Sequence, residues 1–245
     1  MVTSTTLGLY LNATLFNQSV GYKVPPSTPI SDMALNFTSS NEILLDVSPY
    51  SVNSLLLTLQ DSNTFNITIT QETLGPQFGP EYLNTTFGET ILPGLIAHFG
   101  ADQPMSLGFA TKEAPLSYSK ADEMGLHVTG YLMLWVRDEL ACIIEVNDAQ
   151  AGLAASLKDF VLQVQLLSFY INGASVAYSA IGEIDVQAMR TLVNFFARVL
   201  IPVVDRYLEP GFPLPREYFG IVRVKDAFFQ AMDGYLQVGL VPEFI

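Results

Sequence analysis

The feature that most constrains this chain is a change in the spacing of its apolar residues near residue 185. From Met105 to Ala180, apolar and polar residues alternate, and this two-residue period predicts antiparallel strands with one buried face. From Val186 to Leu208 the period lengthens to that of a helix, with Asp185 as its N-cap. The apolar stripe of this helix is made of Val186, Met189, Val193, Phe196, Leu200, Val203 and Tyr207. A long sheet and a long striped helix in one chain are expected to bury these faces against each other.

The other elements complete an α+β fold, in which a long, highly twisted antiparallel sheet wraps around the long amphipathic helix. Ile43–Val47 and Phe65–Ile69 read as short strands on either side of a helix at Pro49–Gln60. A second short helix is predicted at Phe87–Phe99. Turn pairs predict two hairpins, at Asn172-Gly173 and at Asp233-Gly234. The first of these lies in the uncharged run 160–182, which we therefore interpret as a hairpin and not as a membrane span.

Two helices are more apolar along one face than a solvent-facing helix tolerates. We therefore predict a pocket for acyl chains between the helix at Pro49–Gln60 and the helix at Val186–Leu208. Its predicted lining is Val52, Leu55, Leu56, Leu59, Met189, Val193, Phe196 and Leu200. Ordinary core packing explains such stripes equally well.

Composition and charge restrict the classes of partner. The chain has 245 residues, of which 49% are hydrophobic and only 14% charged, so a large buried core is expected and disorder is not. Its formal net charge is −13, and Lys23 is the only basic residue before Lys112. Nucleic acids and anionic membranes are held by converging Lys and Arg side chains, so we expect neither to be a stable partner.

A search for catalytic or cofactor chemistry finds none. His98 and His127 fit no metal-binding spacing, and no Gly-x-Ser-x-Gly motif or glycine-rich phosphate loop occurs. Cys142 lies in an apolar stretch and is expected to be a buried small hydrophobe and not a reactive thiol. We predict that the chain is not an enzyme and has no cofactor or metal.

Five Asn-x-Ser/Thr sequons indicate a compartment. They fall at Asn12, Asn17, Asn36, Asn66 and Asn84, and no further sequon follows. Glycosylation at these sites would place the protein outside the cell or in the lumen of the secretory pathway. A surface simply rich in Ser, Thr and Asn is the alternative. We expect no signal peptide at the start of this sequence, where Met1-Val2-Thr3 leads directly into strand-like residues.

A proline-rich stretch divides the chain. Alternation in Leu7–Phe16 predicts a strand, and Val24–Pro29 then places three prolines within five residues, which neither a helix nor a central strand accepts. The stretch is expected to be an extended connector. If the strand belongs to a sheet shared with other sequence, its open edge would favour self-association.

Four segments in order resemble one known family. Gly211-Phe212-Pro213-Leu214-Pro215 follows the long helix and precedes the last hairpin, and it is similar to the segment at that place in bactericidal/permeability-increasing protein, lipopolysaccharide-binding protein and the phospholipid and cholesteryl ester transfer proteins. Leu7–Phe16 resembles the last strand of their first half, Val24–Pro29 their linker, and Leu44–Thr58 the opening of their second half. The resemblance covers most of the chain.

The resemblance implies a tubular lipid-binding fold and a division of the chain into three parts. Residues 1–23 would end an absent amino-terminal half, residues 24–41 would form the linker, and residues 42–245 would form the carboxy-terminal lipid-binding domain. The implied function is extracellular binding, and also transfer, of phospholipid or a related lipid, with transient contact with a membrane or lipid particle. The basic tip that contacts lipopolysaccharide in that family belongs to the first half, so the resemblance implies no endotoxin binding for this acidic chain.

Two other classes of function stay open from the sequence. One is a secreted recognition or innate-defence module that acts through its surface and keeps a vestigial pocket. The other is a hydrolase whose catalytic residues are dispersed along the chain. A pocket filled by protein side chains would favour the recognition module over the lipid carrier.

Overall fold

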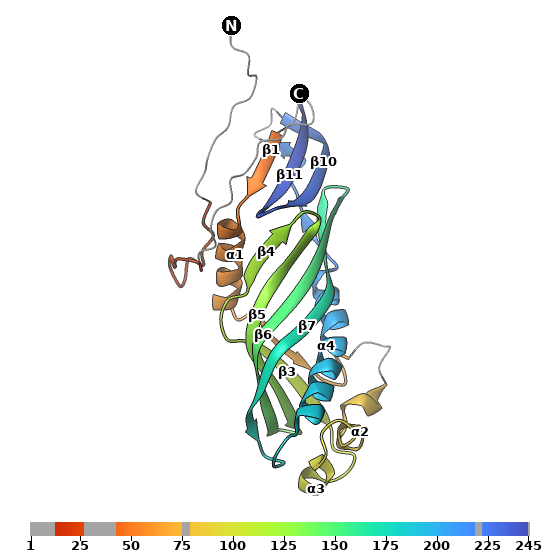
Figure 1. The fold of residues 1–245 in the computed structure, drawn as a ribbon. Coiled ribbons are helices and arrows are strands. Elements are labelled where there is room, and N and C mark those ends of the chain that lie inside the picture. Colours follow the sequence, from red (N-terminus) through yellow and green to blue (C-terminus); the bar gives the residue numbers. More distant parts are fainter. Residues whose placement is uncertain (1–12, 27–42, 75–78, 219–221, 245) are drawn as a thin grey trace.

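The computed structural model describes residues 13–26, 43–74, 79–218 and 222–244, which form an elongated body of two antiparallel sheets and several helices (Figure 1). The larger sheet contains β2 (Asn66–Ile69), β3 (Met105–Thr111), β4 (Leu116–Lys120), β5 (Glu123–Val136), β6 (Glu139–Lys158), β7 (Val161–Ser179) and β8 (Phe212–Pro213). Its order is β2-β3-β5-β6-β7-β8, and β4 pairs with β5 beyond the end of β3. The smaller sheet contains β1 (Ile43–Val47), β11 (Tyr235–Phe244), β10 (Val222–Met232) and β9 (Glu217–Tyr218), in that order.

The long helix α4 (Val186–Leu208) lies along the inner face of the larger sheet, as the sequence predicts (Figure 1). The carboxylate of Asp185 caps it by accepting a hydrogen bond from the Ala188 amide at 2.7 Å. Buried side chains recur along its inner face: Leu192, Val193, Phe196, Val199, Leu200 and Val203. The predicted stripe is too long at both ends, because Val186 and Tyr207 are 63% and 73% exposed. The predicted α+β class, a twisted antiparallel sheet around one long helix, is confirmed.

Strand β7 follows the helix because it contains extra residues. The register between β6 and β7 shifts at four places, which leave Leu167, Asn172 and Ala177 of β7 and Asn147 of β6 without a partner in the pairing. Each is a β-bulge, which bends the strand and increases its twist. The side chains that face the core are therefore spaced alternately by two and three residues: Val164, Leu166, Phe169, Ile171 and Ala174. This spacing lets one 19-residue strand curve around α4.

The predicted hairpin at Asn172-Gly173 is wrong. Asn172 is a bulge residue in the middle of β7, and Gly173 pairs with Asp148 of β6. The chain reverses earlier, at Asp159 and Phe160, whose φ angles are +51° and +65°. Two consecutive left-handed residues are the geometry of a tight two-residue hairpin, which the sequence Asp-Phe does not signal. The guanidinium of Arg216 lies 4.8 Å from the centre of the Phe160 ring, and this cation–π contact also stabilises the turn.

The single helix predicted at Phe87–Phe99 is also wrong. The chain forms two short helices, α2 (Thr85–Gly88) and α3 (Leu95–Phe99), after a turn of 3₁₀ helix at Pro80–Leu83. Pro93-Gly94 separates them, and Gly94 has a φ of +102°, which other residues rarely adopt. The carboxylate of Glu89 accepts hydrogen bonds from the amides of Gly94 and Ile96, at 2.9 and 2.7 Å, and these bonds lower its pKa.

Near the start of the chain the prediction is tested only in part. Residues 7–12 of the strand predicted at Leu7–Phe16 lie outside the described residues, and residues 13–16 form no strand. Of the predicted linker, Val24–Pro26 are described and have no regular structure. The strand at Ile43–Val47, the helix α1 (Pro49–Asp61) and the hairpin at Asp233-Gly234 are confirmed.

By length and composition alone, α4 could also cross a membrane. Its apolar stripe is, however, the part that packs against the sheet, and Phe196 and Val199 are 1% and 0% exposed. We therefore interpret α4 as the core helix of this fold.

Candidate functional site: an apolar pocket between two helices and the sheet

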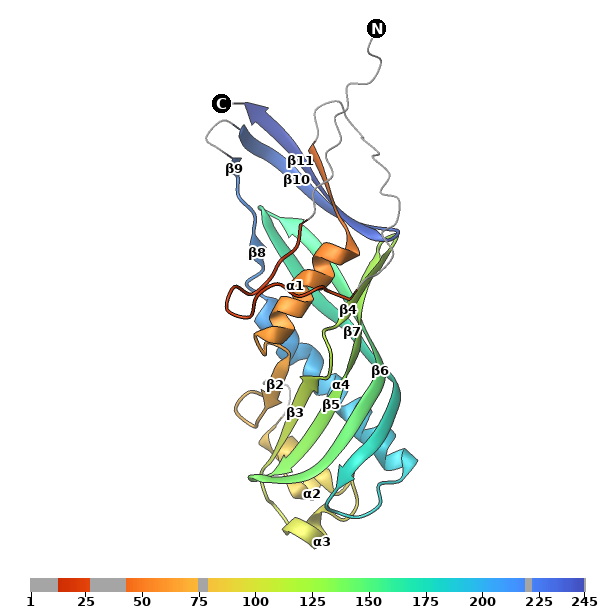
Figure 2. The same ribbon diagram turned by 90° about the vertical axis from the view of Figure 1, so that its left-hand side faces the viewer.

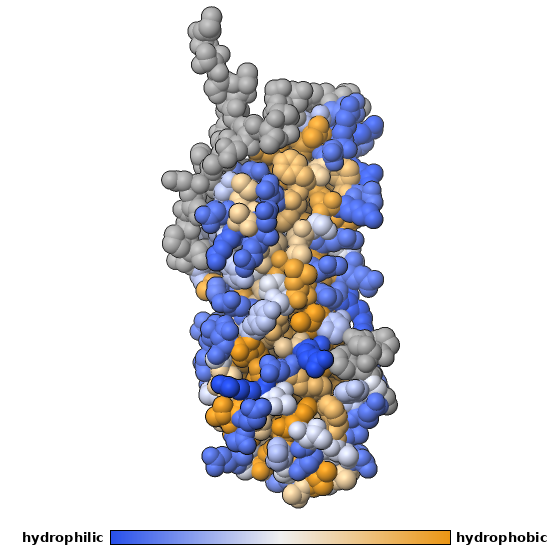
Figure 3. Space-filling view, turned by 45° about the vertical axis from the view of Figure 1, so that its right-hand side comes forward, coloured by the Kyte–Doolittle hydropathy of each residue, from blue (hydrophilic) through white to orange (hydrophobic). Residues whose placement is uncertain are grey.

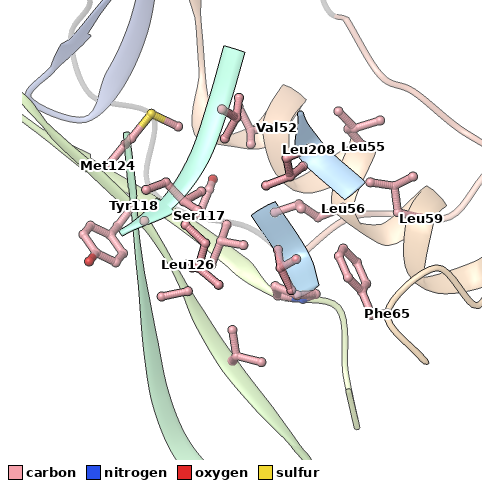
Figure 4. A pocket seen from close by; sticks show the side chains of 18 of the residues that line it. Val52, Leu55, Leu56, Leu59, Phe65, Ser117, Tyr118, Met124, Leu126 and Leu208 are labelled. Atoms are coloured by element: carbon pink, nitrogen blue, oxygen red, sulfur yellow. The ribbon is translucent and has the colours of Figure 1, made fainter. Parts of the chain in front are cut away.

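One pocket in the described part of the chain is both large and apolar. It lies between α1, the second half of α4 and the inner face of the larger sheet, and its upper end meets β11 (Figure 4). Its cavity volume is about 320 Å³, which falls at the lower end of the range of about 300–1,000 Å³ typical of small-molecule sites. None of the residues that line it carries a charge.

Five of the eight residues predicted to line a pocket do so. Val52, Leu55, Leu56 and Leu59 project from α1 (Figure 4), and Leu200 of α4 also lines the pocket. The structure places Met189, Val193 and Phe196 elsewhere, in the core nearer the beginning of α4. The ring of Phe196 lies 6.3 Å from that of Phe109, centre to centre. The whole stripe of α4 is apolar, but only its second half borders this pocket.

The two halves of α4 differ because they have different neighbours. The first half packs against the sheet and against the segment of α2 and α3, where Phe195 lies 5.5 Å from Phe87, centre to centre. Around the second half, α1 takes the place of these short helices, and Val204 and Leu208 border the pocket. This pocket therefore lies where α1, and not the short helices, faces α4.

Hydrogen bonds hold α1 against the sheet at both of its ends. The side chain of Asn53, which is fully buried, accepts bonds from the Ser117 amide and hydroxyl at 2.9 and 2.8 Å. Near the other end, Gln60 exchanges hydrogen bonds with the hydroxyl and carbonyl of Thr111. Because these polar groups form hydrogen bonds with one another, the polar residues near the pocket wall present no unpaired donors or acceptors to the cavity.

On its outer side α1 is covered by residues 13–26. The Leu15 amide donates to the Ser54 hydroxyl at 3.0 Å, and Thr58 donates to the Leu15 carbonyl at 3.2 Å. Lys23 forms an ion pair with Asp61 at 2.6 Å. This segment therefore fixes the position of α1 from outside, while Asn53 and Gln60 fix it from inside.

The sheet side of the pocket is not among the residues that the sequence predicts to line it. This wall is formed by side chains of β2 to β8 and of β11, among them Ile67, Phe109, Leu126, Val128, Ala151, Leu153, Val164, Leu166, Phe212, Tyr235 and Leu236. Strand alternation marks several of these residues as inward-facing, but it cannot separate those that face a cavity from those that face packed side chains. That distinction depends on how far the helices stand from the sheet.

The ionisable groups near the pocket do not suggest catalysis. Burial and the charge of Glu123 raise the pKa of Tyr118, so its hydroxyl stays neutral on the pocket wall. Burial raises the pKa of Cys142 to about 12, so this thiol stays protonated, as the sequence analysis expects of an inert core cysteine. Among the described residues, no three His, Cys, Asp or Glu side chains come together in a way that could hold a metal ion.

Comparison with known proteins identifies the family. A model of the LBP/BPI/CETP family, C-terminal domain, matches residues 1–241. This chain belongs to that family. The family consists of lipid-binding or lipid-transfer proteins and not of enzymes, so the resemblance found in the sequence and the prediction that the chain is not an enzyme are both confirmed. No curated protein sequence matches the chain.

A solved structure supports the fold. The crystal structure of lipopolysaccharide binding protein superimposes with a TM-score of 0.51 at 18% sequence identity. The match covers 94% of this chain and 49% of that protein, so the chain spans about half of its length. At this identity the likeness establishes the tubular fold alone.

Proposed function

We propose that the chain holds the acyl chains of a phospholipid or a related lipid in the pocket between α1 and α4. The observation that supports this function is the uncharged, apolar cavity of about 320 Å³ in a member of a lipid-binding family. Each methylene that leaves water for such a cavity stabilises the complex by about 0.8 kcal/mol. An apolar cavity of this size offers water few hydrogen-bonding partners, so an acyl chain binds in it more favourably than water does.

The lining also indicates how the lipid would be oriented. No charged side chain borders the cavity, so a phosphate or carboxylate inside it would have no ionic partner and would pay a large desolvation cost. Two lining residues, Leu55 and Phe212, are 41% and 56% exposed and therefore mark the mouth of the pocket. A bound lipid would place its acyl chains inside and its headgroup in water at this mouth.

The same family relationship supports the proposed division of the chain. The matched model is that of a C-terminal domain, and the related crystal structure is about twice as long as the match. We retain the proposal that residues 1–23 are the end of a preceding half, residues 24–41 form a linker, and residues 42–245 form the lipid-binding domain. Self-association through an open strand edge is part of the same proposal.

Extraction of bound lipid tests the function directly. The chain, produced in a eukaryotic secretory host and purified without detergent, is expected to carry close to one lipid per molecule, detectable by native mass spectrometry and by analysis of the organic extract. Phospholipid vesicles should displace a fluorescent acyl-chain probe from it. A chain that carries no lipid and retains no probe would contradict the proposed function.

We also propose an extracellular or luminal location, supported by the sequons. Of the five, Asn17, Asn66 and Asn84 are described. Asn66 is exposed on β2, whereas the Asn17 side chain donates to Ser62 at 3.2 Å and the Asn84 side chain caps α2. In a secretory host, Asn66 is therefore expected to be the most fully glycosylated of the three. Endoglycosidase treatment should increase gel mobility, and Asn66→Gln should remove part of that shift. Unchanged mobility would count against this location.

A second function, as a recognition module that contacts another protein, has one observation in its favour. Apolar side chains on β7 are exposed, with Leu167 and Tyr170 at 63% and 65% and with Val176 and Tyr178 further along the strand. Figure 3 shows hydrophobic residues gathered along the length of the face that comes forward from the right of Figure 1, with hydrophilic residues on either side. A protein that binds there would be indifferent to the contents of the pocket, so emptying the pocket would leave its binding unchanged.

A further inference from the structure

Exposed apolar side chains gather on three segments that border the pocket mouth. Eight of the 15 large apolar residues that are exposed in the described chain lie within residues 13–26, α1 and residues 205–216. They are Leu15, Phe16, Val20, Tyr22, Val24, Leu55, Tyr207 and Phe212, and we call them the mouth rim. Scattered exposed apolar residues need no explanation, but a set concentrated around one opening does.

Each part of the mouth rim is connected to the opening. Leu55 and Phe212 line the pocket itself while remaining partly exposed. The Leu15 amide is bonded to Ser54, one residue before Leu55, and Tyr207 precedes the lining residue Leu208. Figure 2 shows the loop of residues 13–26 and strand β8 projecting on the same side of α1, on the left of that view.

The three segments that carry the mouth rim are together electrically neutral, although the protein is strongly acidic. Residues 13–26, 49–61 and 205–216 contain three basic residues, Lys23, Arg206 and Arg216, and three acidic residues, Asp61, Asp205 and Glu209, which gives a net charge of zero. The whole chain has 11 basic and 24 acidic residues and a net charge of −13. The excess negative charge therefore lies elsewhere in the sequence.

Several of these charges already have partners within the protein. Lys23 pairs with Asp61, and one carboxylate oxygen of Asp205 accepts a hydrogen bond from the Leu166 amide at 2.7 Å. Arg216 donates to the carbonyl of Asp159 at 3.0 Å. These groups can approach a low-dielectric surface with part of their desolvation already compensated.

We propose that the mouth rim is a docking surface for a zwitterionic lipid layer, against which the pocket mouth rests while a lipid enters or leaves. This inference rests on the proposed function, since it gives the acyl-chain pocket a route to its ligand. Tyr and Phe side chains favour the boundary between headgroups and acyl chains. The acidic remainder of the molecule is not attracted to lipid and is repelled by anionic lipid, so it orients the neutral rim toward the layer.

The test compares two double variants on vesicles of phosphatidylcholine. Phe16→Asp with Tyr207→Asp places charges on the mouth rim at residues that do not line the pocket. Leu167→Asp with Tyr170→Asp makes the same change on β7, at residues that are similarly exposed. We expect the unmodified chain to co-sediment with the vesicles, the rim variant to bind at least roughly fivefold more weakly, and the β7 variant to bind as the unmodified chain does. A milder rim variant, Phe16→Ser with Tyr207→Ser, should give an intermediate loss.

A second measurement separates docking from ligand retention. The rim variant should hold a soluble fluorescent acyl-chain probe as tightly as the unmodified chain, but should take up a pyrene-labelled phospholipid from vesicles more slowly. A third outcome is possible: neither the unmodified chain nor any variant holds the probe, but the unmodified chain co-sediments with vesicles and the rim variant does not. The proposed function then fails and the docking surface stands.

Three results would overturn the docking surface. The first is an unmodified chain that does not co-sediment with phosphatidylcholine vesicles. The second is an equal loss of co-sedimentation in the rim variant and the β7 variant. The third is an unmodified chain that is dimeric in sedimentation velocity and becomes monomeric in the rim variant without any change at vesicles, because the rim would then be covered by a second copy of the chain.

Discussion

Phe196→Ala is expected to lower the free energy of unfolding by about 3–5 kcal/mol, a large part of the roughly 5–15 kcal/mol that stabilises a typical domain. Phe196 is 1% exposed and sits where α4 meets the sheet, with the Phe109 ring 6.3 Å away, centre to centre. Removing its ring leaves a cavity that neither α4 nor β3 can close without moving a regular element. Urea denaturation followed by circular dichroism measures the loss.

Tyr207→Ala provides the control on the same helix. Its side chain is 73% exposed, so the change should alter stability by no more than about 0.5 kcal/mol. A similar loss in both variants would contradict the assignment of the effect to burial of the Phe196 ring, because alanine favours the helix at both positions. The sequence pattern alone would have chosen Phe196→Asp to test the pocket. In the structure that change buries an unpaired charge in the core, so it is expected to unfold the protein and reveal nothing about the pocket.

Ala151→Phe is expected to weaken binding of an acyl-chain probe by more than tenfold. Ala151 is 5% exposed, lies on β6 between Leu126 and Phe169, and lines the cavity, so a larger side chain there occupies space that the ligand would use. Excluding two or three methylenes costs about 2 kcal/mol, and about 1.4 kcal/mol is already a tenfold change in Kd. A fluorescence titration with the probe measures the change.

The stability of this variant should change little, because the new ring fills existing space. Ala177→Phe adds the same side chain at an exposed bulge of β7 and should bind the probe as the unmodified chain does. If Ala151→Phe proves too large, Ala151→Leu applies the same test with a smaller intrusion. Probe binding that survives in a folded Ala151→Phe variant would contradict the assignment of the pocket.

The sequence predicted best those elements whose signal is local. The helix at Val186–Leu208 was found by its period and its capping residue Asp185, and the helix at Pro49–Gln60 was found by its pattern of apolar residues. The hairpin at Asp233-Gly234 was found from its turn pair, which is also a local signal. In each case the residues that define the element also make the contacts that hold it.

Two of the predictions that failed depended on partners distant in sequence. Asn172-Gly173 is the usual signal of a tight turn, but pairing with β6 along the whole of β7 outweighs that local preference. An apolar cavity does lie between the two helices, but the prediction gave Met189, Val193 and Phe196 the same place in its lining as Leu200. Nothing in the spacing of a stripe tells which turns of a helix meet packed side chains and which meet empty space.

The three bulges of β7 have a consequence for how such a strand can change length during evolution. In a regular strand, the insertion or deletion of one residue turns every later side chain to the opposite face of the sheet. In β7, Leu167, Asn172 and Ala177 already stand outside the pairing, at intervals of five residues. Loss of Leu167 or Ala177 would leave the pairs on both sides of it in regular succession, so the side chains before and after it would keep their faces. A strand with such unpaired residues can lose one of them in evolution while the residues at its two ends keep the same partners.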